Sequence, residues 1–233
     1  MNYDAVMFDL DGTLLPMDYD VFAKGYFKAL ASKLSPLGIE AEALIAAVWT
    51  GTKAMMKNDG TKPNIDAFWD TFSAITGKER SVFEPVSDEF YVNEFHDVKK
   101  LTSENISART AVEQAHRIAK KVVLASNPLF PRNGQLTRMS WVGLGADDFD
   151  HITSYETESF CKPDPRYYLE ICKKLEISPE KCLMVGNDVR EDMKAATEAG
   201  FSGYLVTDCI IPCSDYTWNG PSGSFEQLLD FLK

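Results

Sequence analysis

The sequence lacks the clusters on which two classes of small protein depend. Its 233 residues include only three histidines and five cysteines, and no two cysteines are spaced as CxxC. Structural zinc sites and small disulfide frameworks need such clusters, so the sequence predicts neither. An odd number of scattered cysteines is typical of reduced thiols in a cytoplasmic protein.

Positive charge and long apolar runs are also scarce. The chain has 24 lysines and arginines against 35 acidic residues, a formal net charge of −11. Nucleic acid polymers and anionic membranes bind to basic surfaces, so we expect neither as a partner. No apolar run approaches the roughly 20 residues of a membrane span. The start, MNYDAVMFD, lacks the basic and apolar segments of an export signal, which also favours a cytoplasmic location.

What the chain does contain is an alternation of short apolar runs with amphipathic helical patterns. The apolar runs predict strands that are buried on both faces of a parallel sheet. These strands are expected at 5–8, 122–125, 151–154, 182–185 and 203–206. Helices are expected between the later strands, at 106–121, 165–175 and 188–200. This order predicts an α/β fold with a doubly wound parallel sheet and right-handed crossovers.

One interval interrupts the alternation, because no convincing strand occurs between residue 9 and residue 122. Helical patterns occupy it at about 19–34, 41–57, 64–75 and 87–98, with aromatic residues at helical spacing that are typical of a core. A helical insertion after the first strand indicates a second, smaller domain. We therefore predict a core of residues 1–16 and 99–233 and an inserted helical domain of residues 17–98.

Polar residues follow four of the predicted strands, where open parallel sheets bind their ligands. They are Asp9 and Asp11, Ser126 and Asn127, Lys162, and Asp188 and Asp192. Carboxylates can hold Mg²⁺, whereas a hydroxyl, backbone amides and a lysine suit phosphate oxygens. An acidic protein also needs such a local positive centre to attract an anionic substrate. Together these residues predict a phosphoryl-transfer site.

Each of these residues also has an ordinary structural explanation. Asp11 and Gly12 fit a simple turn, Asp188 fits a helix cap, and Lys162 fits a solvated surface charge. Asp192 lies in the first turn of a predicted helix, where the helix dipole favours an acid in any case. The conjunction of four signals, each after its own strand, favours the functional interpretation.

The motifs DLDGT, Ser126, KPDP and GNDVREDM occur in the order and approximate spacing of the haloacid dehalogenase superfamily, which the chain resembles. The resemblance implies a Rossmann-like core, and it identifies the inserted segment with the α-helical cap of many members. One departure is GND, where GDS or GDT is frequent, which moves the metal-binding aspartate one place later. The second aspartate distinguishes the chain from members that cleave carbon–halogen bonds.

The resemblance also implies a role for each residue in the first motif. Asp9 matches the nucleophile that becomes an aspartyl phosphate, and Asp11 matches the acid that protonates the leaving oxygen and then activates water. Gly12 is expected to allow a tight turn, and Thr13 is expected to fix the loop by hydrogen bonding.

The remaining motifs imply ligands for phosphate and metal. Ser126, Asn127 and Lys162 match phosphate-binding positions, and Lys162 also neutralises charge beside the nucleophile. Mg²⁺ is expected between a carboxylate oxygen of Asp9, the backbone carbonyl of Asp11 and the side chain of Asp188. Asp192 is expected to support the metal or Lys162.

The sequence thus predicts a Mg²⁺-dependent phosphatase that acts on a small phosphorylated metabolite. Three alternatives stay open: a phosphomutase, a phosphonate hydrolase and a non-catalytic phospho-ligand-binding protein on the same fold. A phosphonate hydrolase needs a lysine in the cap, where Lys24, Lys28 and Lys53 lie. A phosphoacceptor receiver domain is disfavoured because it would have about half this length. Nothing in the sequence indicates an oligomeric state.

Overall fold

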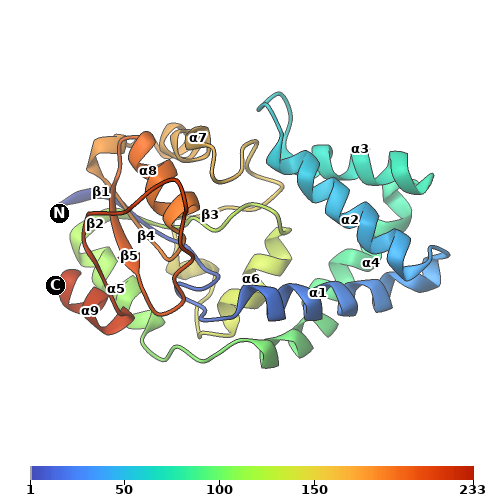
Figure 1. Ribbon diagram of the computed structural model, residues 1–233, viewed down its shortest axis with the longest axis horizontal. Helices are drawn as coiled ribbons and strands as arrows, with labels where there is room; N and C mark the ends of the chain where they lie inside the picture. The colour runs from blue at the N-terminus through green and yellow to red at the C-terminus, as the bar shows by residue number, and fades with distance from the viewer. Residues whose placement is uncertain (1) are drawn as a thin grey trace.

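The computed structural model describes residues 2–233 and contains a six-stranded parallel sheet (Figure 1). The strand order is β3-β2-β1-β4-β5-β6, so the first strand lies in the middle of the sheet. Its strands are β1 (Tyr3–Phe8), β2 (Ala119–Leu124), β3 (His151–Ile152), β4 (Cys182–Gly186), β5 (Ser202–Val206) and β6 (Ser222–Gly223). All five expected strands are present, and the α/β fold with a doubly wound parallel sheet is confirmed.

Helices cover both faces of the sheet, and β1 shows how its residues are divided between them. Val6 and Phe8 belong to the apolar cluster that includes helices α5 (Ala108–Ile118) and α9 (Phe225–Phe231). Ala5 and Met7 belong to the cluster on the opposite face, with helices α7 (Pro165–Leu175) and α8 (Ala195–Glu198). Both faces of β1 are therefore buried, as its uninterrupted apolar sequence requires.

A group of helices lies at the other end of the molecule from the two termini (Figure 1). Its members are α1 (Tyr19–Leu34), α2 (Ala41–Met56), α3 (Asn64–Thr76) and α4 (Arg80–Val92). Asp18 caps α1 by accepting a hydrogen bond from the amide of Val21 at 3.0 Å. The short helix α6 (Arg132–Ser140) follows β2 and packs against α4 and the 3₁₀ helix of Glu94–Leu101. The core of this group is strongly aromatic, as its spacing predicted.

Two expected helices have different bounds. The helix expected over 106–121 ends at Ile118, because Ala119 pairs with Tyr3 and begins β2. The helix expected over 87–98 is α4, which begins at Arg80 and is followed by the 3₁₀ helix. Its buried face has helical spacing in spite of the internal Pro85, and consists of Phe83, Ser87, Phe90 and Tyr91.

Smaller differences occur at the edges of the sheet. Strand β3 has two residues instead of the expected four, and the sequence did not predict β6, α6 or α9. Within residues 2–233, no helix is long and apolar enough to cross a membrane. All five cysteines are free, as expected.

Candidate active site

The first motif forms a tight loop at the carboxyl end of β1. The amide of Asp9 donates to the carbonyl of Val185 at 2.9 Å, which fixes the end of β1 against β4. Gly12 then has a φ of +86°, and a Cβ there would lie 2.3 Å from Nδ2 of Asn187. Both the backbone conformation and the close approach thus require glycine.

Thr13 and Asn187 tie this loop to the loop after β4. The Thr13 hydroxyl donates to Oδ1 of Asn187 at 2.9 Å, and Nδ2 of Asn187 donates to the carbonyl of Cys209 at 2.7 Å. Asn187 is almost completely buried. Its two hydrogen bonds join the loop after β1, the loop after β4 and the segment that contains Cys209. The sequence indicated Thr13 for this purpose but not its partner.

The polar residues that follow β1, β2 and β4 line one cavity of about 360 Å³. Its predicted members are Asp9, Asp11, Ser126, Asn127, Asp188 and Asp192. Tyr19, Trp49, Thr52 and Met56 from α1 and α2 also line it, so the helical group closes the cavity on one side. The structure thus brings together residues that are far apart in the sequence, with 183 positions separating Asp9 from Asp192.

Lys162 contacts Asp9 and is buried, with an exposed fraction of only 1%. Its Nζ donates to Oδ1 of Asp9 at 2.9 Å and to Oδ1 of Asp192 at 2.6 Å. Burial alone would lower the pKa of Lys162, but the charges of Asp192 and Asp9 raise it well above its usual value. The lysine is therefore a fixed positive charge against one oxygen of Asp9.

Asp188 begins the helical segment after β4, as its expected capping role requires. Its Oδ1 accepts the amides of Arg190 at 2.7 Å and Glu191 at 2.8 Å, which leaves Oδ2 outside these bonds. Asp188 and Glu191 have the sequence spacing of a capping box, which predicts that the Asp188 amide donates to the Glu191 side chain, and this prediction is wrong. The amide of Asp188 donates instead to Oδ2 of Asp192 at 2.9 Å, because the first turn over Val189–Lys194 is a wide π-helix.

Glu191 faces the cavity as a result, although the sequence indicated it only as a capping residue. Its Oε2 accepts a hydrogen bond from Nδ2 of Asn127 at 3.0 Å. Burial, together with the charges of Asp188 and Asp192, raises the pKa of Glu191 to about 8, although Lys162 opposes the rise. The only sequence signal for Glu191 was its position in the motif, directly before Asp192.

Arg138 on α6 is the second functional candidate that sequence reasoning missed. It is completely buried, and its Nη1 donates to Oδ2 of Asp11. Burial raises the pKa of the Asp11 carboxyl, and the charge of Arg138 opposes that rise. Arg138 belongs to none of the four motifs. A single arginine in a polar helical sequence is usually on the surface, so the sequence did not indicate its burial.

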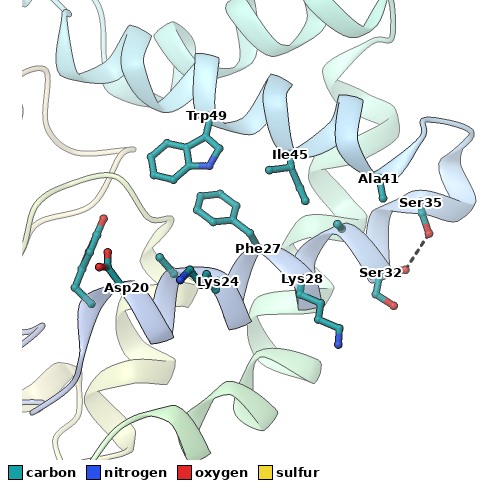
Figure 2. Close-up of a pocket in the computed structure, with 12 residues that line it drawn as sticks. Asp20, Lys24, Phe27, Lys28, Ser32, Ser35, Ala41, Ile45 and Trp49 are labelled. Carbon is teal, nitrogen blue, oxygen red and sulfur yellow. Dashed lines mark hydrogen bonds between the residues drawn. The ribbon is translucent and has the colours of Figure 1, made fainter.

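A second cavity of about 620 Å³ runs between α1 and α2 (Figure 2). Figure 2 shows Trp49 and Ile45 extending from α2 toward Phe27 on α1, with Lys24 and Lys28 on the same helix. The rings of Phe27 and Trp49 are 4.7 Å apart. Tyr19 and Trp49 line both cavities, so the second cavity, the groove between α1 and α2, borders the cavity that contains Asp9 and Asp11.

The acidic residues that line the cavity can be compared with the oxygen ligands that Mg²⁺ requires. Among residues 2–233, no three acidic, histidine or cysteine side chains are gathered closely enough to enclose a metal ion. Mg²⁺ keeps several waters, however, and one or two carboxylates are sufficient to bind it. Asp9 and Asp188 follow the neighbouring strands β1 and β4 and line the same cavity, which Asp11 also lines. This donor set fits the ion.

Two curated proteins with phosphatase names resemble part of the chain. Glyceraldehyde 3-phosphate phosphatase of Methanothermobacter thermautotrophicus is 38% identical over 58 residues, which are 25% of this chain and 26% of that protein. Phosphatase MT3486 of Mycobacterium tuberculosis is 34% identical over 100 residues, which are 42% of this chain and 44% of that protein. The chain therefore spans less than half of the length of either relative.

Solved structures show the same fold over the whole chain. A predicted phosphoglycolate phosphatase from Haemophilus somnus is superimposed with a TM-score of 0.60 and 16% identity, over 100% of this chain and 99% of that one. The family model of haloacid dehalogenase-like hydrolases matches residues 3–200, which contain all four motifs. The chain belongs to the haloacid dehalogenase-like hydrolase family.

Proposed function

We propose that the protein is a Mg²⁺-dependent phosphatase that hydrolyses a small phosphorylated metabolite through an aspartyl phosphate on Asp9. The observation that carries this proposal is the cavity itself. Asp9 and Asp11 line it beside Ser126 and Asp188, and Lys162 donates to one oxygen of Asp9. The phosphatase names of the partial relatives support the same reaction.

In the first step, a carboxylate oxygen of Asp9 attacks phosphorus and the bond to the leaving oxygen breaks. Asp11 gives its proton to that oxygen, which leaves as an alcohol. In the second step, Asp11 takes a proton from water, and the water oxygen attacks phosphorus and releases Asp9. A covalent intermediate divides hydrolysis in this way into two easier displacements.

The other residues orient the phosphate and compensate its charge. The hydroxyl of Ser126 and the amide of Asn127 lie in the cavity wall, where they can donate to phosphate oxygens. Lys162 holds Asp9 in a fixed orientation, and alignment of this kind is most of what phosphoryl transfer needs from a protein. Mg²⁺, held by Asp9, Asp188 and the carbonyl of Asp11, would neutralise negative charge on the phosphate.

We also propose that residues 17–98 form a cap domain on a core of residues 1–16 and 99–233. Tyr19 and Trp49 line both the catalytic cavity and the groove, which supports a role for this segment in contacting the leaving group of a bound substrate. Among the lining residues that the structure describes, the catalytic cavity contains no lysine from the cap, which disfavours a phosphonate hydrolase.

The proposal is tested by phosphate release from p-nitrophenyl phosphate, a substrate that makes few demands on the cap. We expect release that stops after chelation, returns with added Mg²⁺ and is absent in Asp9→Asn. Phosphate release also separates a phosphatase from a phosphomutase, which transfers the group to a second hydroxyl. Full activity in chelator, or equal activity in Asp9→Asn, would contradict the proposal.

A further inference from the structure

Arg138 is a buried cation whose contacts converge on the proposed acid–base residue. Its exposed fraction is 0%, and its Nη1 and Nη2 donate to Oδ2 of Asp11 and Oε1 of Gln135. The guanidinium also stacks on the ring of Phe130, with its central carbon 4.0 Å from the ring centroid. A buried charge is costly unless it is paired, so these contacts fix the group in one position.

The two oxygens of Asp11 have different surroundings. Oδ2 is bound to Arg138, whereas Oδ1 is buried and has no hydrogen-bond partner among residues 2–233. Asp11 lines the catalytic cavity, although its side chain is mostly buried. Oδ1 is therefore the oxygen of Asp11 that no hydrogen bond within the described residues engages.

We propose that Arg138 is a positioning residue that holds Asp11 through Oδ2 and so presents Oδ1 for proton transfer in both steps. This inference rests on the proposed phosphatase reaction. Arg138 itself keeps its charge and its protons throughout, since guanidinium does not lose a proton in proteins. The proton that Oδ1 gives to the leaving oxygen in the first step is replaced in the second by one from water.

A direct role of Arg138 in binding phosphate does not fit its surroundings. The side chain has no exposed surface, and each of its three nitrogens donates one hydrogen bond, to Asp11, to Gln135 and, at 3.4 Å, to the carbonyl of Gly134. The arginine therefore acts through Asp11. Its effect should depend on how much proton transfer a substrate needs.

Leaving groups of different acidity provide the test. In Arg138→Gln we expect kcat for glycerol phosphate, whose alkoxide needs a proton, to fall about tenfold more than kcat for p-nitrophenyl phosphate. The KM for glycerol phosphate should change little, because the arginine does not touch substrate, whereas the KM for p-nitrophenyl phosphate should fall together with its kcat as the second step becomes slow. During turnover of p-nitrophenyl phosphate, aspartyl phosphate should accumulate on the Arg138→Gln enzyme, because water activation becomes the slow step. Arg138→Lys should restore part of the loss, since it keeps the charge but not the forked geometry.

Two comparisons separate positioning from general damage. Thr137→Val is the matched control, because Thr137 is also buried on α6 but donates to the carbonyl of Tyr91 at 2.8 Å, away from Asp11. It should leave the ratio of the two substrates unchanged. In an Asp11→Asn background, Arg138→Gln should add no further loss, because the residue that it positions has already been disabled.

The outcomes distinguish this inference from the proposed function. Equal losses on both substrates, or a full additional loss in the Asp11→Asn background, would overturn the role of Arg138 while leaving a phosphatase. If Arg138→Gln does not fold, the folded Arg138→Lys variant must still show the selective loss on glycerol phosphate, and no selectivity there would overturn the inference. A wild-type protein that releases no phosphate and forms no phosphoenzyme would contradict the proposed function itself.

Discussion

Lys162 and Arg138 are two buried cations that hold the two aspartates of one loop. Lys162 lies in the segment between β3 and α7 and contacts Asp9 at 2.9 Å, with Asp192 as its second partner. Arg138 lies on α6 and contacts Asp11, with a neutral amide as its second partner. Each cation orients one carboxylate, and the two side chains approach from different elements.

The difference between the two contacts fits the two roles proposed for Asp9 and Asp11. Asp9 is held by an ammonium that also binds a second carboxylate, Asp192. Asp11 has one oxygen held by a planar guanidinium and one oxygen free, which suits a group that must accept and return a proton. We expect loss of the first contact to affect all substrates and loss of the second to affect mainly those with poor leaving groups.

The largest effect is expected from Lys162→Met. It removes the positive charge beside the attacking carboxylate, and we expect kcat for p-nitrophenyl phosphate to fall about 10³-fold. Circular dichroism at the assay temperature checks that the variant is folded, because two buried acids lose their partner. Lys174→Met is the matched control, since Lys174 lies on α7 and pairs with Glu158 and Glu170. An equal loss in the control would contradict the assignment.

The next largest effect separates Asp188 from Asp192. We expect Asp188→Asn to lower activity about 100-fold and to raise the Mg²⁺ concentration needed for half-maximal rate. Asp192→Asn should cost about tenfold, because Asp192 acts through Lys162 and the Asp188 amide. Initial rates over a Mg²⁺ titration measure both. Equal losses in two folded variants would mean that the ligand and the supporting residue have been confused.

A smaller and more selective effect is expected in the groove between α1 and α2. Trp49→Ala should change the ratio of kcat/KM between bulky and small phosphate esters by about tenfold, with little change in kcat for p-nitrophenyl phosphate. Ile75→Ala is the control, because Ile75 is a half-exposed apolar residue of α3 outside both cavities. An unchanged ranking of substrates in Trp49→Ala would remove this groove from substrate selection.

The smallest effect on catalysis is expected at a third buried charge, Glu158, which is bound by His151 at 2.8 Å and Lys174 at 3.0 Å. Burial raises the pKa of Glu158, but His151 and Lys174 outweigh it and lower the pKa below 4.5. Glu158→Gln should leave kcat unchanged and lower the free energy of unfolding by about 2 kcal/mol near neutral pH.

The pH dependence of that stability loss follows from the sign of the shift. A lowered pKa in the folded state means that Glu158 stabilises the protein fully above its unfolded-state pKa, and that the contribution is lost as the pH falls. The difference in urea stability between wild type and Glu158→Gln should therefore shrink below pH 4.5. A difference that grows as the pH falls below 4.5 would contradict this account of Glu158 and its partners.

Local sequence patterns predicted the parts of the fold that depend on neighbouring residues. The apolar run at 5–8 predicted a strand buried on both faces, and the helical pattern at 165–175 predicted α7, which Asp164 caps by accepting the amide of Arg166 at 2.8 Å. The expected end of α5 at Lys121 was wrong, because Ala119 pairs with Tyr3 and begins β2. These two residues are far apart in the chain. Long-range pairing of this kind overrides local helical preference.

The candidate site shows the same division. Residues in compact motifs, such as Lys162 and Asp188, were predicted because each follows its own strand. Arg138 was not, because its burial results from the packing of α6 against α4, which no local pattern encodes. The cavity-facing position of Glu191 was missed because it depends on the π-helical turn after Asp188. The proposed roles of these residues remain predictions until they are measured.

The most direct test compares phosphoryl trapping in Asp9→Asn and Asp11→Asn with a radiolabelled aryl phosphate. An aryl oxide needs little protonation, so Asp11→Asn should still be phosphorylated on Asp9 but should lose the water activation that removes the group. We predict acid-stable, hydroxylamine-sensitive label on the peptide that contains Asp9 in Asp11→Asn, and no label in Asp9→Asn. Label on another residue, or equal trapping in both variants, would contradict the assignment of nucleophile and acid–base residue.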